Sequence, residues 1–222
     1  MSFMDTFSGY NQILMHPEDQ EKTSFMMSRG IYCYKVMPFG LKNAGSTYQS
    51  LVNTMFADLI GQTMEVYIDD MLVMSLEAED HISHLHQAFS TLRKYHMKLN
   101  PAKCLFGVSS GKFLGYIVTH RGIEANPDKI GAIQSISPTR NIKEDQKLTG
   151  RMAALSRFIS RLSDKSHAFF ETLTNPKDFL WTEKCKAALQ ELKVFLTTPP
   201  PLLSKPLFGE VWYYTSPFLS TR

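Results

Sequence analysis

Two adjacent carboxylates stand in the middle of an apolar stretch, residues 66–74. Asp69 and Asp70 have strand-forming residues on both sides, VYI before them and MLVM after them. Side chains alternate between the two faces of a strand, so the flanking apolar residues cannot share one face of a single straight strand. We therefore predict a hairpin with a tight turn at Asp69-Asp70. Carboxylates this close repel each other and favour a bound cation, although an ordinary Asp-containing β-turn is the alternative interpretation.

Asp5 is a third carboxylate at the end of a predicted strand, which starts at Ser2. If this strand and the Asp69-Asp70 hairpin belong to one sheet, the three carboxylates can hold one metal site. Mg²⁺, with Mn²⁺ as the alternative ion, takes oxygen ligands, and a site of two or three carboxylates leaves positions for phosphate oxygens and water. Two such ions about 3.5–4 Å apart suit the transfer of a nucleotide to a 3′-hydroxyl. The pattern thus predicts phosphoryl transfer.

The elements around these acids predict an α+β fold for residues 1–119. The strand near residue 5 is followed by a hairpin over 23–37 with its turn at Arg29-Gly30, a helix, the Asp69-Asp70 hairpin, a second helix and two short strands. This order is typical of an antiparallel sheet with helices packed on one face. The first helix has an apolar stripe of Tyr48, Leu51, Val52, Met55, Phe56 and Leu59, and the second helix, from about Asp80, has Ile82, Leu85, Phe89 and Leu92. We interpret His81, His84 and His86 as a solvated face of that second helix.

Residues 120–198 are predicted to be mostly helical. Asn126-Pro127 and Asn141 are good helix starts, and Thr182 opens another helix. The helix from Asn141 is expected to continue through a stripe that ends at Leu162; its members are Leu148, Met152, Leu155, Ile159 and Leu162. Residues 199–222 begin with three prolines, a stiff linker, and contain an aromatic strand candidate at 211–214.

Composition and charge are those of an ordinary globular protein. The chain has 222 residues, 43% of them hydrophobic and 20% charged, and a formal net charge of +3, which permits a polyanionic partner without requiring one. Its three cysteines are few and widely spaced, which fits neither a disulfide framework nor a zinc ribbon. No apolar run is long enough to span a membrane and the start lacks a signal-peptide pattern, so we expect an intracellular protein without a membrane partner.

Five motifs in a fixed order resemble those of a reverse transcriptase. They are FMDTFSGYNQI, YKVMPFGLKNAGSTYQ, VYIDDMLV, LNPAKC and KFLGYIV. More narrowly, the chain resembles the Pol polyprotein of gypsy-type long-terminal-repeat retrotransposons, of the kind abundant in plant genomes. Two later segments, LTGRMAALSRFISRLSDK and FLWTEKCKAALQELKVFL, resemble the thumb and connection of the same polyproteins. The resemblance implies a partial fingers and palm at 1–119, a thumb and connection at 120–198, and a linker with the start of an RNase H-like domain at 199–222.

The resemblance also implies a role for each residue that matches a motif. Asp5, Asp69 and Asp70 would be catalytic and bind two Mg²⁺ ions, and backbone N–H groups of Thr6 and Phe7 would contact the triphosphate of the incoming nucleotide. Tyr10 would be the steric gate against the ribose 2′-hydroxyl, Phe39 and Gly40 would lie against the incoming base pair, and Lys103 would protonate the leaving pyrophosphate. The primer grip would be Phe113, Leu114, Gly115 and Tyr116, and Arg151, Arg157 and Arg161 would contact the nucleic-acid backbone.

Plainer interpretations exist for several of these residues. Tyr10 and Phe39 could be core aromatics, Lys103 a solvated surface lysine and Gly40 a turn residue after Pro38. Basic helix faces such as the one with Arg151 are often only solvated.

The implied partners are an RNA or DNA template with its primer, deoxynucleoside triphosphates and the remaining Pol domains, which are RNase H, integrase and protease. The family has a basic fingers segment before the first Asp that finds no match in this chain, so we expect little or no polymerase activity from the chain alone. The position where RNase H has its first acid reads Thr215-Ser216-Pro217. Two other functions stay open, a non-catalytic nucleic-acid-binding remnant of a retroelement and a nucleotide cyclase. In an active element the location would be a cytoplasmic virus-like particle.

Overall fold

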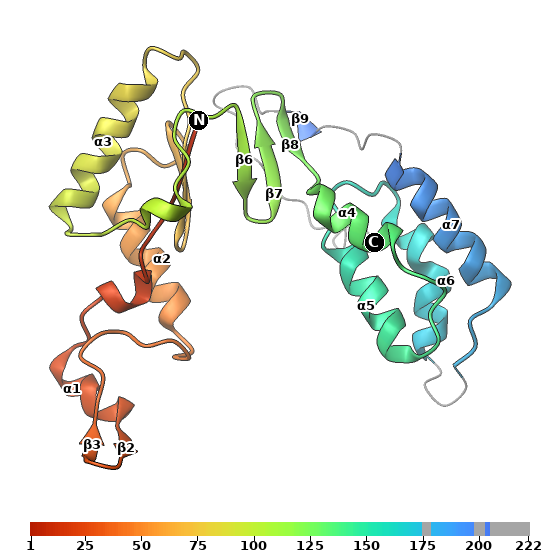
Figure 1. Cartoon of the computed structure of the whole chain (residues 1–222), viewed down its shortest axis with the longest axis horizontal. Coiled ribbons are helices and arrows are strands. Elements are labelled where there is room, and N and C mark those ends of the chain that lie inside the picture. The colour runs from red at the N-terminus through yellow and green to blue at the C-terminus, as the bar shows by residue number, and fades with distance from the viewer. Residues whose placement is uncertain (175–178, 198–202, 205–222) are drawn as a thin grey trace, which may run out of the picture. The chain divides into compact units, whose positions relative to one another are not determined.

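The computed structural model describes residues 1–174, 179–197 and 203–204. The chain forms two compact units that divide between Leu114 and Gly115, whereas the sequence suggested a boundary after residue 119 (Figure 1). The predicted linker and RNase H-like start at 199–222, including the strand candidate at 211–214, lie outside the described residues except for residues 203–204. Within the described part of the chain, no helix combines the length and the apolar character needed to cross a bilayer.

A three-stranded antiparallel sheet organises the first unit. Its order is β1 (Ser2–Asp5), β5 (Asp70–Val73) and β4 (Met64–Tyr67). The register places Asp5 opposite Asp70, and Tyr67 opposite Asp70 on the other side. The predicted convergence of the Asp5 strand and the Asp69-Asp70 hairpin in one sheet is therefore confirmed.

Two helices and the sheet share the core of the first unit. Helix α2 (Ala44–Met55) and helix α3 (His81–Lys94) both pack into one apolar cluster with the strands (Figure 1). The cluster contains Met4, Met71 and Val73 from the sheet, Tyr48, Val52 and Met55 from α2, and Ala88 and Leu92 from α3. This arrangement confirms the predicted α+β fold and the apolar stripe of α2.

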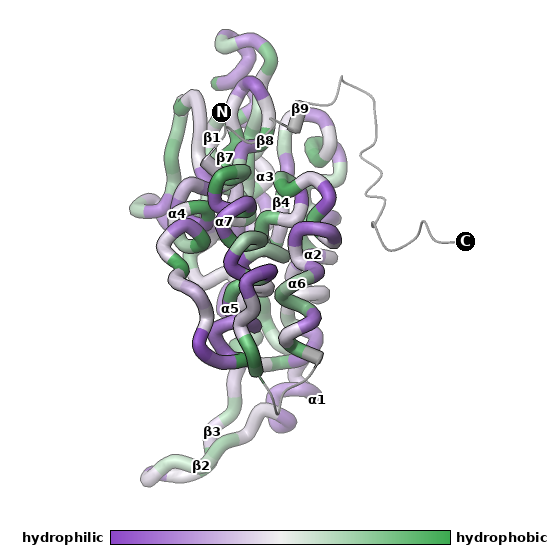
Figure 2. The backbone as a smooth tube through the Cα atoms, turned by 90° about the vertical axis from the view of Figure 1, so that its right-hand side faces the viewer, coloured by the Kyte–Doolittle hydropathy of each residue, from purple (hydrophilic) through white to green (hydrophobic). Residues whose placement is uncertain are grey.

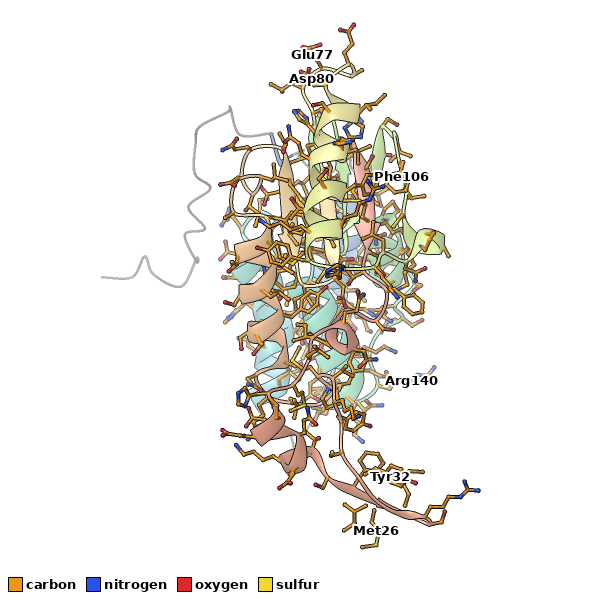
Figure 3. All side chains as sticks on the ribbon, turned by 90° about the vertical axis from the view of Figure 1, so that its left-hand side faces the viewer. Met26, Tyr32, Glu77, Asp80, Phe106 and Arg140 are labelled. Carbon is orange, nitrogen blue, oxygen red and sulfur yellow. The ribbon has the colours of Figure 1, made fainter. Side chains whose placement is uncertain are left out.

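The remaining elements of this unit are short. They are the 3₁₀ helices η1 (Gly9–Gln12), η2 (Glu21–Thr23) and η3 (Pro101–Lys103), helix α1 (Pro17–Gln20), and strands β2 (Phe25–Met27), β3 (Gly30–Tyr32) and β6 (Ser110–Phe113). Strands β2 and β3 form the predicted hairpin, but Met27 pairs with Gly30, so the turn is at Ser28-Arg29, one residue earlier than predicted. The hairpin projects from the rest of its unit, and its side chains Met26 and Tyr32 are exposed (Figure 3).

The inner face of α3 differs from the prediction. Ile82 is 78% exposed, and His81 and His84 take the inward positions at the start of the helix, followed by Leu85, Ala88 and Leu92. The hydroxyl of Ser75 lies 2.9 Å from His81 Nδ1 and 2.7 Å from His84 Nδ1. The two histidines are thus hydrogen-bonded and partly buried, and the expectation of a solvated face holds only for His86. Residues 81, 84, 85 and 88 share one face of a helix, just as the members of the predicted apolar stripe do. Helical spacing alone therefore does not decide which of these faces turns inward.

In its described residues, the second unit consists of a small antiparallel sheet and four helices. Strands β7 (Tyr116–Thr119) and β8 (Gly122–Glu124) pair, and β9 (Leu203–Ser204) pairs with β8. The helices are α4 (Pro127–Gln134), α5 (Ile142–Ala153), α6 (Leu162–Thr174) and α7 (Glu183–Thr197). The side chains of Asn126 and Asn141 accept hydrogen bonds from the first turns of α4 and α5, as predicted. Hydrophilic and hydrophobic residues alternate along α5, which is amphipathic (Figure 2).

The predicted long helix from Asn141 to Leu162 is wrong. Helix α5 ends at Ala153, and a turn segment with Arg161 at φ +53° leads into α6. Leu155 and Ile159 are buried although they are not in a helix, because the segment folds back and packs α6 against α5. The apolar spacing satisfied a continuous helix and a bent chain equally well, so periodicity alone could not separate them.

A buried acid in this unit has an unusual hydrogen-bond pattern. Asp145 in α5 is fully buried, its Oδ2 contacts the hydroxyl of Thr172, and its Oδ1 has no hydrogen-bond partner among the residues that the structure describes. The Thr172 hydroxyl also lies 2.7 Å from the carbonyl oxygen of Phe169, and its single proton cannot serve both oxygens. Protonation of Asp145 would let it donate to Thr172 while Thr172 donates to Phe169. Burial accordingly raises the pKa of Asp145.

We predict that Asp145→Asn removes a pH dependence from folding. The pKa of this acid is raised in the folded state, so the wild type is most stable below the unfolded value of about 3.9 and loses stability as the pH rises through the folded value. The asparagine variant cannot ionise and should keep its urea midpoint constant between pH 4 and 7, apart from changes shared with all variants. Chemical denaturation at a series of pH values measures this. Equal pH dependence in the two proteins would show that Asp145 is ionised in the fold.

Candidate active site

The hairpin between β4 and β5 turns at Ile68-Asp69, one residue earlier than predicted. Asp70 already belongs to β5 and pairs with Tyr67. Ile68 adopts φ +50°, a left-handed conformation that is strained for a β-branched residue. The predicted turn at Asp69-Asp70 is therefore wrong by one position. As a consequence Asp69 lies in the turn, whereas Asp70 is the first residue of β5.

Gln49 of α2 holds this turn. Its Oε1 accepts a hydrogen bond of 2.7 Å from the backbone N–H of Ile68, and its Nε2 donates to the carbonyl oxygen of Val66 at 3.3 Å. Strained backbone persists where the surroundings stabilise it, and it is frequent at functional sites. The side-chain amide satisfies backbone groups on both sides of the strained residue and so fixes the turn.

We predict that Gln49→Ala destabilises the fold and loosens the turn. The variant leaves the N–H of Ile68 without its partner, so we expect a loss of about 1–3 kcal/mol in the free energy of unfolding. Urea denaturation measures this loss, and amide hydrogen exchange at residues 66–70 reports on the turn. Gln87→Ala on the exposed side of α3 is the matched control. The assignment of Gln49 to the turn fails if the two variants behave alike.

Asp5, Asp69 and Asp70 lie together at one end of the sheet. Asp5 and Asp70 are opposite each other in the register, and the N–H of Thr6 donates to the carbonyl oxygen of Asp69 at 3.1 Å. The carboxylate of Asp69 accepts a hydrogen bond of 2.5 Å from the Thr6 hydroxyl. Burial raises the pKa of Asp70, and the charges of Asp5 and Asp69 raise it further. The three acids therefore form one electrostatic site.

Lys103 is the cation of this site. Its Nζ lies 3.2 Å from Asp5 Oδ2, while Asp5 Oδ1 is buried and has no hydrogen-bond partner among the described residues. The backbone holds both ends of this ion pair close, because the N–H of Asn100, next to η3, donates to the carbonyl oxygen of Asp5 at 2.8 Å. Lys103 is thus more than a solvated surface lysine, since it neutralises one of three clustered acids.

The donor set fits a divalent cation. In the described part of the chain, Lys103 pairs with one of the three carboxylates and the buried Asp5 Oδ1 has no donor, so the site has excess negative charge and a spare oxygen ligand. In the described part of the chain no three His, Cys, Asp or Glu side chains are already gathered around one point. Asp5 instead points one oxygen to Lys103, and Asp69 points one to Thr6. Binding a metal at these acids would require side-chain rotation, and their assignment as ligands stays a prediction.

The backbone N–H groups of Thr6 and Phe7, which were predicted to contact the triphosphate, already donate hydrogen bonds within the chain. The N–H of Thr6 donates to Asp69, and that of Phe7 donates to the carbonyl oxygen of Lys98 at 2.9 Å. Neither N–H group is available to a triphosphate, because the backbone here continues the pairing of β1 with its neighbours on both sides. The side chain of Thr6 contacts Asp69 instead, a role that sequence reasoning missed.

The aromatic residues near the acids form a connected group. Tyr10 makes edge-on contacts with Phe39, at a centroid distance of 5.2 Å, and with Tyr48 at 5.5 Å. Phe39 is 68% exposed, which argues against a core residue, and Tyr10 is half-buried. Gly40 has φ +99°, so its role as a turn residue is certain from the backbone. Tyr10 and Phe39 remain predicted nucleotide contacts.

The predicted primer grip spans the junction between the two units. Phe113 ends β6, Leu114 and Gly115 form a turn with positive φ, and Tyr116 begins β7. In the second unit, the ring of Tyr116 has Lys129 Nζ at 5.0 Å and the guanidinium of Arg157 at 5.6 Å. These contacts connect one predicted primer-grip residue with one predicted backbone contact.

The other two predicted backbone contacts have protein partners. Arg151 donates to the carbonyl oxygen of Ala132 at 2.5 Å, and Arg161 pairs with Asp164 at 2.7 Å. The guanidinium of Arg161 is largely exposed, but Arg151 is partly buried and helps to join α4 to α5. A structural role for Arg151 is therefore evident, and nucleic-acid contact by all three arginines stays a prediction.

Comparison with protein families decides the class of this site. Residues 1–118, more than half of the chain, match the family described as reverse transcriptase (RNA-dependent DNA polymerase). The chain belongs to the reverse transcriptase family. The match includes Asp5, Asp69, Asp70 and Lys103, so the acids of this reverse transcriptase chain lie within the family's own region.

Relatives of this reverse transcriptase chain include transposon polyproteins. The Tf2-3 and Tf2-7 polyproteins of Schizosaccharomyces pombe (strain 972 / ATCC 24843) are both 28% identical to it over 199 residues. Each match covers 90% of this chain and 15% of the polyprotein. The chain thus spans about 15% of the length of the curated relatives that it matches.

Solved structures confirm the fold of reverse transcriptase palm and fingers. The foamy viral protease-reverse transcriptase in complex with RNA/DNA hybrid has a TM-score of 0.81 and 19% identity, and the match covers 90% of this chain and 27% of the viral one. The same viral protein in complex with dsDNA gives a TM-score of 0.83 at 19% identity, with 92% and 43% coverage. At this level of identity the similarity is one of fold.

Proposed function

We propose that this chain contributes the palm, adjoining parts of the fingers, and the thumb and connection of an RNA-directed DNA polymerase. The enzyme would be part of the Pol polyprotein of a gypsy-type long-terminal-repeat retrotransposon. The observation that supports this most is the register of Asp5 opposite Asp70 with Asp69 in the adjoining turn, within the region that matches the family. The polyprotein relatives support the retrotransposon context.

The reaction would be the addition of a deoxynucleotide to the 3′ end of a primer. Asp5, Asp69 and Asp70 would hold Mg²⁺, and the bound ions would activate the 3′-hydroxyl and neutralise the triphosphate. Lys103, whose Nζ lies 3.2 Å from Asp5 Oδ2, would give a proton to the leaving pyrophosphate. Because the protein needs no covalent chemistry, its part is to position these groups and to stabilise charge.

The proposed partners follow from the same reaction. An RNA or DNA template with its primer would contact Phe39 and the residues Phe113–Tyr116, and deoxynucleoside triphosphates would be selected beside Tyr10. Basic residues of the second unit, Arg157 among them, would contact backbone phosphates. Two foamy viral structures that share this fold are complexes with RNA/DNA hybrid and with dsDNA, which supports a nucleic-acid partner.

The proposal is tested by metal and nucleic-acid binding of the 222-residue chain. Free Mn²⁺ is measured by electron paramagnetic resonance, and binding of a labelled RNA–DNA primer–template is measured by fluorescence anisotropy. We expect saturable Mn²⁺ binding that Asp69→Asn weakens by at least about 10-fold, and primer–template binding that falls with salt. Equal Mn²⁺ binding by the wild type and Asp69→Asn would contradict the proposed site.

Primer extension separates polymerase activity from binding alone. Extension that requires Mg²⁺ and is lost in Asp69→Asn would demonstrate the reaction directly. Primer–template binding without Mn²⁺ binding would favour the second candidate, a non-catalytic nucleic-acid-binding remnant. Two observations favour this candidate: Lys103 and Thr6 already engage Asp5 and Asp69, and in the described residues no three acid side chains are arranged around one point as metal ligands.

A further inference from the structure

A buried chain of hydrogen bonds ends at the carboxylate of Asp69. The hydroxyl of Tyr48 donates to Thr6 Oγ1 at 3.0 Å, and the Thr6 hydroxyl donates to Asp69 Oδ1 at 2.5 Å. Tyr48 is completely buried in α2 and Thr6 is 3% exposed at the end of β1. Three elements, a helix, a strand and a hairpin turn, therefore meet through three side chains.

The direction of this chain is fixed by its protons. A carboxylate can only accept, so the single proton of Thr6 points to Asp69, and the oxygen of Thr6 is left to accept from Tyr48. Burial raises the pKa of Tyr48 and the charge of nearby Asp69 raises it further, so the phenol keeps its proton and remains a donor. The other acceptors near this phenol are the Asp69 carboxylate and Met97 Sδ at 3.6 Å, and a thioether is a weak acceptor.

The three groups are closely packed. A Cβ on Gly9 would overlap Asp69 Oδ1 and lie 2.6 Å from both Thr6 Oγ1 and the Tyr48 hydroxyl. The ring of Tyr10 covers Tyr48 from another side at a centroid distance of 5.5 Å. The hydroxyl groups are thus enclosed, and the glycine is the residue that makes room for them.

We propose that Thr6 and Tyr48 are positioning residues that fix the orientation of the Asp69 carboxylate. The bond from Thr6 engages Oδ1 and leaves Oδ2 as the oxygen for a ligand, and Tyr48 fixes the Thr6 hydroxyl from the core. The inference rests on the proposed function, because only there does Asp69 bind a metal. Groups that orient metal ligands in this way affect metal affinity without touching the ion.

The Mn²⁺ affinities of three test variants and two control variants test the proposal. Thr6→Val removes the bond to Asp69 and should weaken Mn²⁺ binding by about 10-fold. Tyr48→Phe removes the second bond and should weaken it less, and Thr6→Ser keeps the hydroxyl and should bind as the wild type does. Thr91→Val in α3 and Tyr95→Phe just after α3 make the same chemical changes away from the site and are the controls. If Asp69→Asn loses Mn²⁺ while Thr6→Val and Tyr48→Phe keep it fully, the proposed function stands and the positioning role is refuted.

Urea denaturation without metal gives a second test that is independent of the proposed function. Tyr48→Phe should lower the urea midpoint in the wild type, because it breaks a buried hydrogen bond. In the Thr6→Val background the Tyr48 hydroxyl has already lost its bond to Thr6, so the same substitution should lower the midpoint clearly less than it does in the wild type. Equal effects of Tyr48→Phe in the two backgrounds would refute the hydrogen-bond chain. Should the wild type bind no Mn²⁺, the proposed function fails while this cycle still decides whether the chain exists.

Discussion

Replacing Gly9 with alanine is expected to abolish Mn²⁺ binding and to destabilise the first unit strongly. The added Cβ would meet Asp69 Oδ1, Thr6 Oγ1 and the Tyr48 hydroxyl, all closer than real Cβ atoms come to other atoms. Thr6 and Tyr48 are buried, so neither can move away freely. Overpacking of this kind typically costs about 1–3 kcal/mol, and here it also displaces a proposed metal ligand.

The matched control for this prediction is Gly131→Ala. Gly131 is in α4, and nothing lies within 4 Å of a Cβ placed there. Alanine in a helix is favoured over glycine by about 1 kcal/mol, so this variant should be slightly more stable than the wild type. Urea denaturation and Mn²⁺ titration of both variants measure the difference. A Gly9→Ala chain that binds Mn²⁺ as tightly as the wild type would show that the contacts around Asp69 are looser than described.

Replacing Asp70 with asparagine is expected to stabilise the metal-free chain and to remove metal binding. Burial and the charges of Asp5 and Asp69 raise the pKa of Asp70 above its unfolded value. An acid with a raised pKa favours folding below its unfolded pKa, and this advantage is lost as the pH rises through the folded value. At neutral pH the ionised side chain therefore opposes folding, and asparagine relieves that repulsion. The same loss of charge removes an oxygen anion that Mg²⁺ or Mn²⁺ would bind.

The urea midpoint and the Mn²⁺ affinity of the Asp70→Asn variant test this prediction. The urea midpoint of Asp70→Asn should exceed that of the wild type at pH 7, and the difference should shrink toward pH 4 as Asp70 becomes protonated in the wild type. Mn²⁺ affinity should fall by at least about 10-fold at pH 7. Asp80→Asn, an exposed acid at the start of α3, is the control. A variant less stable than the wild type at pH 7 would mean that Lys103 already neutralises the group of acids.

Much of the fold of the first unit could be predicted from local patterns. The alternation around residues 66–74 required a hairpin, and the strand ending at Asp5 could reach it only through a shared sheet, as the register shows. The apolar stripe on α2 predicted the buried face of the helix correctly, because its members Tyr48 and Val52 lie in the apolar cluster. Patterns of this kind succeed when one face of an element is apolar and the other is not.

The details that were missed depend on contacts distant in sequence. The turn lies at Ile68-Asp69 because Gln49, nineteen positions earlier, supplies a partner to the Ile68 N–H, and no property of the hairpin itself reveals that. The Thr6 hydroxyl and the inward His81 and His84 are further examples, because short polar side chains bind groups that only the folded chain brings near. Within α3, polar residues at helical spacing were as well placed as Ile82 to face inward.

Strand β1 is held on both edges, and this has a consequence for how the site would come apart. On one edge it pairs with β5, and on the other Phe3 and Leu105 exchange two backbone hydrogen bonds of 2.7 Å. Asp69, in contrast, is in a two-residue turn that depends on Gln49 and Thr6. Slowly exchanging amides open only with global unfolding, whereas turns open locally at much lower free energy. Asp5 should therefore keep its place until the whole unit unfolds. Brief openings of the turn would displace Asp69 alone, so the site would lose this one carboxylate many times for each global unfolding event.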